Sequence, residues 1–221
     1  MKQWYYKIIT AVISLGVIPV LLLLPIMKMQ VAVSVVSVDF APTVNANWIF
    51  HFAKDKETGN ATLDNYLNTL DGVFDGAKLW ENLGDIRARV IIFAAAIAIC
   101  VLIALAIIAL VFVLKQKRSK LWILALSGAG LLSAITASAA FSSIAAPLLD
   151  GRMALGDLLG VGSLISGFIN LQALSMGSAV PVILLLFVLL LLVVTVFMVL
   201  DLRDDSSPKK RKKAKKKTVK R

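Results

Sequence analysis

The stretch AVPVILLLFVLLLLVVTVFMVL, Ala179–Leu200, is followed by a basic tail, KKRKKAKKKTVKR, Lys209–Arg221. The 22 residues of the first stretch carry no charge, and a helix of that length spans a hydrocarbon core of about 30 Å. The tail contains ten Lys and Arg residues and no acid. Because lysine-rich flanks stay on the cytoplasmic side, the two stretches predict an integral membrane protein with a cytoplasmic C-terminus.

The composition supports this class. The chain is 59% hydrophobic and 17% charged, which is too apolar for a soluble domain of this size. Residues 201–221 hold eleven basic residues against three acids, so +8 of the net charge of +11 belongs to the tail. The single cysteine, Cys100, lies in an apolar segment and excludes an intrachain disulfide.

The tail follows a membrane helix so closely that anionic lipid lies within its reach. We expect it to be disordered and to bind lipid head groups, whereas nucleic acid is a disfavoured partner. The predicted lipid-binding residues are Lys209, Lys210, Arg211, Lys212, Lys213, Lys215, Lys216 and Lys217.

Three more apolar runs have spanning length, and with the closing run they predict four membrane helices. The predicted order is an N-terminal segment with the first helix (1–28), an extracytoplasmic cap (29–89), the second helix (90–114), a basic cytoplasmic loop (115–120), the third helix (121–146), an apolar extracytoplasmic loop (147–178), the fourth helix (179–200) and the tail (201–221).

Charged flanks predict the orientation. The N-terminal MKQWYYK and the loop KQKRSK are basic, while the segments between them are neutral or acidic. Both termini are therefore expected in the cytoplasm and the protein in the plasma membrane. A signal peptide over Ile8–Met27 is disfavoured by its length, its prolines and the lack of a cleavage pattern. The uncharged Leu158–Leu174 is expected to form an interfacial or re-entrant helix, because a fifth span would place the tail outside.

The cap combines two periodicities. Val31–Phe40 is rich in β-branched residues and predicts a strand emerging from the first helix. Apolar residues at helical spacing over 62–74 and 77–83 predict two short helices. The expected fold is thus an all-α integral membrane protein, a four-span helical bundle with a small α+β extracytoplasmic cap.

Candidate chemistry is sparse. The four apolar runs contain no Asp, Glu, Lys, Arg or His, which argues against a proton-driven pump. His51 is the only histidine, and the nearby acids do not match a calcium-binding loop. We therefore expect no catalytic residue, no metal and no cofactor, and the protein is not expected to be an enzyme.

The third helix is rich in small residues at a spacing of four, which lets helix backbones approach closely. Ala94 and Ala98 of the second helix offer a matching surface. The predicted helix-packing residues form two rows, Ala125, Ala129, Ser133 and Ala137 in the first and Gly130, Ala134, Ser138 and Ser142 in the second.

The layout resembles that of claudin-like tetraspan proteins: four spans, both ends inside, and a strand leading out of the first helix. The segment Leu79–Phe93 is similar to the entry into their second span, with Arg87 or Arg89 as the matching arginine. Trp48 and Trp80 are present, but the two cysteines of the family's first outer loop are absent. The resemblance implies a membrane-organising or adhesion-type protein.

The function expected from the sequence is a non-enzymatic scaffold, adhesion-type protein or accessory subunit. Its expected partners are the lipid bilayer and other membrane proteins or a second copy of itself, bound through the outer cap and the small-residue helix face. The alternative is a component of a transporter or channel for a small or apolar solute, for which Ser and Thr side chains of the third helix could line a path.

Overall fold

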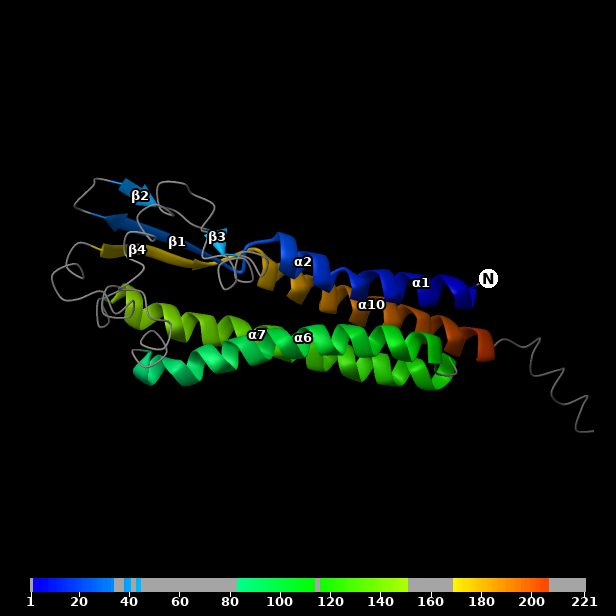
Figure 1. Ribbon diagram of the computed structural model, residues 1–221. Helices are drawn as coiled ribbons and strands as arrows, with labels where there is room; N and C mark the ends of the chain where they lie inside the picture. Colours follow the sequence, from blue (N-terminus) through cyan, green and yellow to red (C-terminus); the bar gives the residue numbers. More distant parts are fainter. Residues whose placement is uncertain are drawn as a thin grey trace, which may run out of the picture.

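The computed structural model contains four long helical segments side by side and a small β-sheet at one end of them (Figure 1). It describes residues 2–33, 38–40, 43–44, 83–113, 116–150 and 169–206. Among these, four helices are long and apolar enough to cross a membrane, Trp4–Leu23, Arg87–Val113, Ser119–Leu149 and Ala179–Arg203. The architecture is mostly helical and consistent with a multi-pass membrane protein.

The helices form a ring of neighbours. α6 (Arg87–Val113) packs against α1 (Lys2–Leu15) and α7 (Gln116–Leu149), and α10 (Ala179–Ser206) packs against the same two helices. We call the end where α1 begins and α10 finishes the terminal end, and the opposite one the sheet end (Figure 1). Because α1 and α7 have the same two neighbours, α1 faces α7 across the centre of the bundle.

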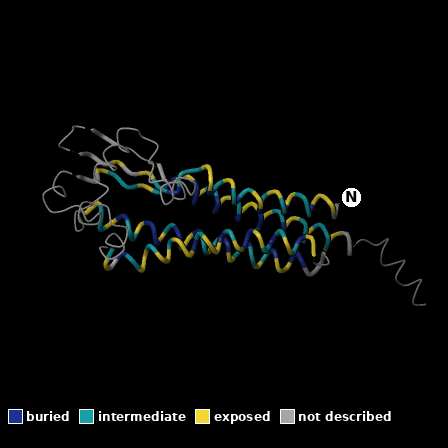
Figure 2. Tube along the Cα trace, viewed as in Figure 1, coloured by how far each residue is buried: buried dark blue, intermediate teal, exposed yellow. Residues whose placement is uncertain are grey.

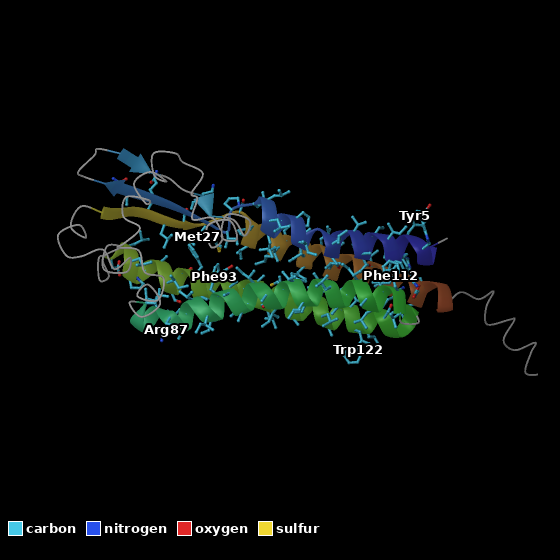
Figure 3. The ribbon with its side chains drawn as sticks, in the orientation of Figure 1. Tyr5, Met27, Arg87, Phe93, Phe112 and Trp122 are labelled. Atoms are coloured by element: carbon cyan, nitrogen blue, oxygen red, sulfur yellow. The ribbon has the colours of Figure 1, made fainter. Side chains whose placement is uncertain are left out.

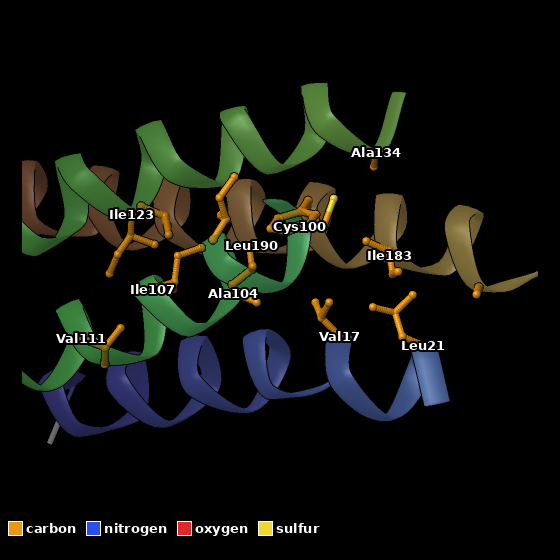
Figure 4. Packing of buried hydrophobic residues seen from close by; sticks show 14 of the residues in the cluster. Val17, Leu21, Cys100, Ala104, Ile107, Val111, Ile123, Ala134, Ile183 and Leu190 are labelled. Atoms are coloured by element: carbon orange, nitrogen blue, oxygen red, sulfur yellow. The ribbon is translucent and has the colours of Figure 1, made fainter. Parts of the chain in front are cut away.

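Buried residues follow one side of each helix and point to the common centre (Figures 2 and 4). They recur at alternating steps of three and four residues, the spacing that keeps a stripe on one face of helices packed nearly parallel. On α10 this stripe consists of Val180, Ile183, Phe187, Leu190 and Val194. The outward sides carry exposed Leu, Ile and Val, as a lipid-facing surface would.

The first span is interrupted at Gly16, where α1 gives way to α2 (Val17–Leu23). Pro19 has no N–H to donate to the Leu15 carbonyl, so the regular ladder cannot continue through this point. Pro19 is tolerated because it lies in the first turn of α2, where N–H groups lack intrahelical partners. α2 ends before Pro25, which disfavours helical conformation in the residue preceding it.

Another proline, Pro147, lies within the last turn of α7. It cannot donate to the Ser143 carbonyl four residues earlier. Arg89 of α6 compensates, because its Nη1 donates a hydrogen bond of 2.6 Å to that carbonyl oxygen. The sheet ends of α6 and α7 are thereby tied together.

The sheet is built around β1 (Met27–Val33), which is antiparallel to all three of its partners. β4 (Ile169–Met176) pairs along the whole of β1, while β2 (Val38–Phe40) and β3 (Thr43–Val44) share the other edge. Gln172 is the extra residue of a bulge in β4, because Gln30 pairs with Ala173 and Val31 with Leu171.

The β1–β4 ladder continues into the helices without a flexible connection. The Gly177 N–H donates to the Ile26 carbonyl at 2.8 Å, and the Ala179 N–H donates to the Pro25 carbonyl at 3.0 Å. A Cβ atom on Gly177 would overlap the backbone of Pro25. Glycine is therefore required where the first and last spans meet the sheet.

Several sequence predictions need correction. Val31–Phe40 is not one strand, because β1 begins at Met27 and residues 38–40 return beside it as β2. Residues 169–174 form most of β4 instead of the end of an interfacial helix, since pairing with β1 satisfies their backbone groups. The two helices expected over 62–74 and 77–83 lie outside the described residues.

The helix bounds also differ from the predicted ones. α7 begins at Gln116, within the segment assigned to a cytoplasmic loop, and ends at Leu149. α10 extends to Ser206, so the first six residues of the expected disordered tail are helical. Polar residues can extend a helix beyond the membrane, which is why an apolar run marks the span and not the end of the helix.

Candidate functional site

The two small-residue rows of the third span are each partly buried and partly exposed. In the first row Ala137 is buried, Ser133 is half-buried, and Ala125 and Ala129 are exposed. In the second row Gly130 and Ala134 are buried, Ser138 is half-buried and Ser142 is exposed. Steps of four residues advance about 40° beyond a full turn, so each row winds across the helix surface. Only the middle of the helix therefore brings members of both rows to the interface.

Close packing in the sheet-end half involves three helices. The Ser133 hydroxyl donates a hydrogen bond of 2.9 Å to the Ala96 carbonyl, linking α7 to α6. Ala96 itself is buried with Ala137 and with Val180 of α10. Ala94 and Ala98, the matching surface expected from the sequence, are exposed.

Gly130 makes the closest approach between α7 and α10. A Cβ atom at this position would overlap the aromatic ring of Phe187, which is fully buried. On the α6 side, the Cys100 thiol lies 3.7 Å from the Gly130 carbonyl oxygen and donates to it. Gly130 thus lets one large ring fill the centre of the bundle while the backbones stay close.

A partly buried ion pair lies at the terminal end. Lys120 Nζ lies 2.6 Å from Asp201 Oδ2 and donates a second hydrogen bond of 3.2 Å to the Phe197 carbonyl. The Lys120 side chain is 3% exposed and that of Asp201 is 42% exposed. Lys120 Nζ also lies 5.0 Å from the centre of the Tyr6 ring, within cation–π range. α7, α10 and α1 therefore meet at one ammonium group.

From this pair toward the sheet end, hydroxyl groups face the interior of the bundle. Tyr6, Thr10 and Ser14 of α1 and Ser127 of α7 are fully buried. None of these four hydroxyl oxygens has a hydrogen-bond partner in the described part of the chain. Thr10 and Ser119 lie beside the Tyr6 phenol. We refer to Tyr6, Thr10, Ser14, Ser119, Lys120, Ser127 and Asp201 as the polar cluster.

Other hydroxyls of the bundle behave differently. Thr136, Ser138, Ser142 and Thr195 each donate to the carbonyl four residues earlier in their own helix, at 2.7–3.1 Å. Such bonding is the usual way for Ser and Thr to satisfy a hydroxyl in a helix. The hydroxyls of Tyr6, Thr10, Ser14 and Ser127 do not use it, which marks these four as a distinct set.

The polar cluster does not extend through the bundle. Toward the sheet end, the described interior contains the apolar side chains of Val17, Leu21, Ile183 and Phe187, with Ala134. We call this region the apolar half. Phe187 fills the centre against Gly130, so the described core has no continuous polar path from one end to the other.

Aromatic side chains mark the outside of the terminal end. Trp4, Tyr5 and Trp122 are each more than half exposed, and Tyr5 and Trp122 project outward from opposite sides of the bundle (Figure 3). Tryptophan and tyrosine at such positions are typical of a membrane–water interface. The predicted lipid-binding residues of the tail, 209–217, lie outside the described residues.

Within the described residues, no three His, Cys, Asp or Glu side chains come together as a metal-binding group. Comparisons of the chain with protein-family models, curated proteins and solved structures found no match. Any statement about function therefore rests on the geometry of the chain itself.

Sequence reasoning did not identify the polar cluster. Lys120 falls in the predicted loop and Asp201 in the predicted tail, because each lies one residue outside an apolar run. The signal that could have found them is periodicity. Steps of three and four residues lead from Ala134 back through Gly130, Ser127 and Ile123 to Lys120, so the buried stripe continues into the charged segment.

Proposed function

We propose that the protein is a non-enzymatic membrane scaffold or accessory subunit that holds its outer sheet at a fixed place for binding other membrane proteins. The observation that carries this proposal is the direct continuation of β1 from the first span and of β4 into the last span. A sheet attached in this way cannot swing freely on linkers. It is suited to presenting a surface and less suited to opening and closing over a substrate.

The described part of the sheet has two unlike faces. Met176 packs against the buried Ala96, Ala137 and Val180, so one face is fixed to the bundle. Lys28, Gln30 and Ser175 are exposed on the opposite face. The bulged Gln172 is exposed as well, and bulges often redirect a side chain toward a binding surface. This polar face is the proposed contact surface.

The proposed location is the plasma membrane, with both termini cytoplasmic and the sheet outside. The N-terminal MKQWYYK and the tail are both basic in sequence, and basic flanks favour the cytoplasmic side. Lys120 contributes less to this bias than its place in KQKRSK suggests, because Asp201 neutralises it. The claudin-like layout is part of this proposal and concerns the arrangement of the spans only.

Transport of a small or apolar solute is the alternative. The hydroxyls of the polar cluster favour it, but the apolar half with Phe187 at its centre opposes it. Purified protein in liposomes would test this alternative directly. Solute flux in the absence of any partner would support transport and contradict the scaffold.

Site-specific photo-crosslinking in intact cells tests the scaffold. A photoreactive phenylalanine analogue at Gln172 should give a discrete protein adduct, identified by mass spectrometry after purification. The matched control carries the same analogue at Leu192, which is exposed on the middle of α10 and should face lipid. Absence of any adduct at Gln172, Ser175 and Lys28, with the chain recovered alone, would overturn the proposal.

Two measurements test the proposed orientation and the lipid contact. A cysteine added after Arg221 should resist impermeant thiol reagents in intact cells, and rapid labelling would contradict the proposed topology.

Neutral replacements over 209–217 should weaken binding of the full chain to anionic vesicles while the bundle stays folded. Unchanged vesicle binding would exclude the tail as a lipid-binding segment.

A further inference from the structure

The buried hydroxyls of the polar cluster form a row that enters the bundle from its terminal end. Tyr6, Thr10 and Ser14 follow one another at intervals of four residues on α1. At the rise of an α-helix, this row extends about 12 Å along the bundle. Ser127 lies seven residues beyond Lys120 on the facing helix and reaches about the same depth.

Leaving these groups unpaired is unfavourable. A hydroxyl transferred from water to an apolar interior loses its hydrogen bonds, and the loss is not recovered by packing. Four hydroxyls in this position lack a partner within the described residues, although Thr195 and Thr136 of the same bundle bond to their own helices. These four hydroxyls therefore need hydrogen-bonding groups that the described residues do not supply.

We infer that water molecules occupy the polar cluster and bridge its hydroxyls, forming a hydrated pocket that opens at the terminal end and is closed at the apolar half. This inference concerns a site separate from the outer sheet and does not depend on the scaffold proposal. Buried water commonly makes such bridges between polar groups that have no other partner.

The chemistry of the cluster selects water over an ion. Lys120 and Asp201 neutralise each other at 2.6 Å, and the other members are neutral hydroxyls that can both donate and accept. A small neutral molecule with both capacities matches them, whereas a free cation or anion would find no unpaired charge among the described members. Asp201 is 42% exposed, so solvent reaches the pair from its side.

The inner limit of the pocket follows from the next layer of residues. Val17, Ala134 and Phe187 lie beyond Ser14 and Ser127 and offer no side-chain hydrogen bond. Water beyond this layer would be unpaired. The pocket is therefore hydrated over the terminal half only.

X-ray radiolytic labelling of the full chain in lipid nanodiscs tests this inference, because hydroxyl radicals formed from bound water oxidise side chains next to it. Tyr6 and Phe187 are both aromatic and both 0% exposed. We expect Tyr6 to be oxidised several-fold faster than Phe187. Equal and slow oxidation of the two residues would overturn the inference.

A variant separates bound water from fraying of the first helix. Thr10→Val combined with Ser14→Ala removes two bridging hydroxyls and keeps the side-chain volume similar, so Tyr6 oxidation should fall several-fold. The matched control is Thr195→Val, which removes an exposed hydroxyl bonded within α10 and should leave Tyr6 oxidation unchanged. Unchanged Tyr6 oxidation in the double variant would attribute the labelling to fraying and contradict the inference.

Ser127→Ala provides an independent variant on the facing helix in case the double variant does not fold. Its effect should have the same sign and be smaller, because one bridging hydroxyl is lost instead of two. Retained elution as a single species on size-exclusion chromatography confirms folding for each variant. A folded Ser127→Ala protein with Tyr6 oxidised as fast as in the parent would contradict bridging by Ser127.

Discussion

The two halves of the bundle are held together by different kinds of contact. In the sheet-end half, small residues let backbones approach, as at Gly130 beside Phe187 and at Gly177 beside Pro25. In the terminal half, apolar side chains such as Val111 and Ile123 are also buried, and the Lys120–Asp201 pair and the buried hydroxyls add polar contacts to them. The first kind of contact fixes distances between backbones, while the second fixes the pairing of polar groups.

This difference shows how a membrane protein can combine rigidity with polarity. Lipid tails are as apolar as the core, so helices associate through close packing and interhelical hydrogen bonds and not through the hydrophobic effect. The close approaches at Gly130 and Gly177 lie in the half of the bundle that carries the sheet. Polar contacts are tolerated near the terminal end because water is close to it.

The largest effect is expected for Gly177→Ala. The added Cβ would overlap the Pro25 backbone, and backbone atoms cannot move aside as a side chain can, so we expect a loss of about 3 kcal/mol. Unfolding free energy in mixed micelles measures it. Gly128→Ala is the matched control, because no atom lies within 4 Å of its added Cβ. That variant should be neutral or stabilised by up to about 1 kcal/mol. Equal losses in both would contradict the assigned junction.

The ion pair should respond asymmetrically to substitution. Asp201→Asn leaves the buried Lys120 ammonium without a counter-charge, and we expect a loss of about 2 kcal/mol, below the range for a fully buried pair. Lys120→Met keeps the apolar stem and leaves Asp201, which solvent can reach, so its loss should be under about 1 kcal/mol. The same unfolding measurement compares them. A larger loss for Lys120→Met would show that Asp201 is the member that depends on the pair.

Gly130→Ala should weaken the contact between α7 and α10. The added Cβ meets the Phe187 ring, which can tilt, so we expect a loss of about 1–2 kcal/mol. Phe187→Leu in the same chain should recover part of this loss, because the smaller side chain leaves room. A double-mutant cycle gives the coupling energy between the two positions. Additive effects would mean that the ring and the glycine do not share one space.

The smallest effect is expected for Ser133→Ala. It removes the hydrogen bond of 2.9 Å to the Ala96 carbonyl, and interhelical bonds of this kind contribute about 0.6 kcal/mol on average. Thr136→Ser serves as the control, because its hydroxyl can keep the bond to Leu132 within α7 and should change stability by under about 0.5 kcal/mol. Identical changes would remove Ser133 from the set of helix-linking residues.

The apolar runs predicted the existence of the four long helices because spanning length leaves few other structures for such segments. Ends were less predictable. Lys120 and Asp201 lie in helices that continue beyond the apolar runs, and their pairing depends on two segments 81 positions apart. Similarly, β4 could not be separated from a helix by its composition, since its partner β1 lies far away in the chain.

The candidate site was only partly visible in the sequence. The sequence shows the small residues of the third span, but the burial of Gly130, Ala134 and Ala137 and the exposure of Ala125 and Ala129 depend on where α10 and α6 lie. The hydroxyl row of α1 has a regular spacing that could have been read. Its burial could not, because the same spacing also suits an outward face.

By itself, the sequence determined the membrane class, the number of long apolar helices and the concentration of positive charge in the tail, because these depend on local length and composition. Tertiary structure alone decided that Lys120 pairs with Asp201, that Gly177 packs against Pro25 and that the Phe187 ring packs against Gly130. Each of these contacts joins residues distant in the chain, so neither residue's local sequence indicates its partner.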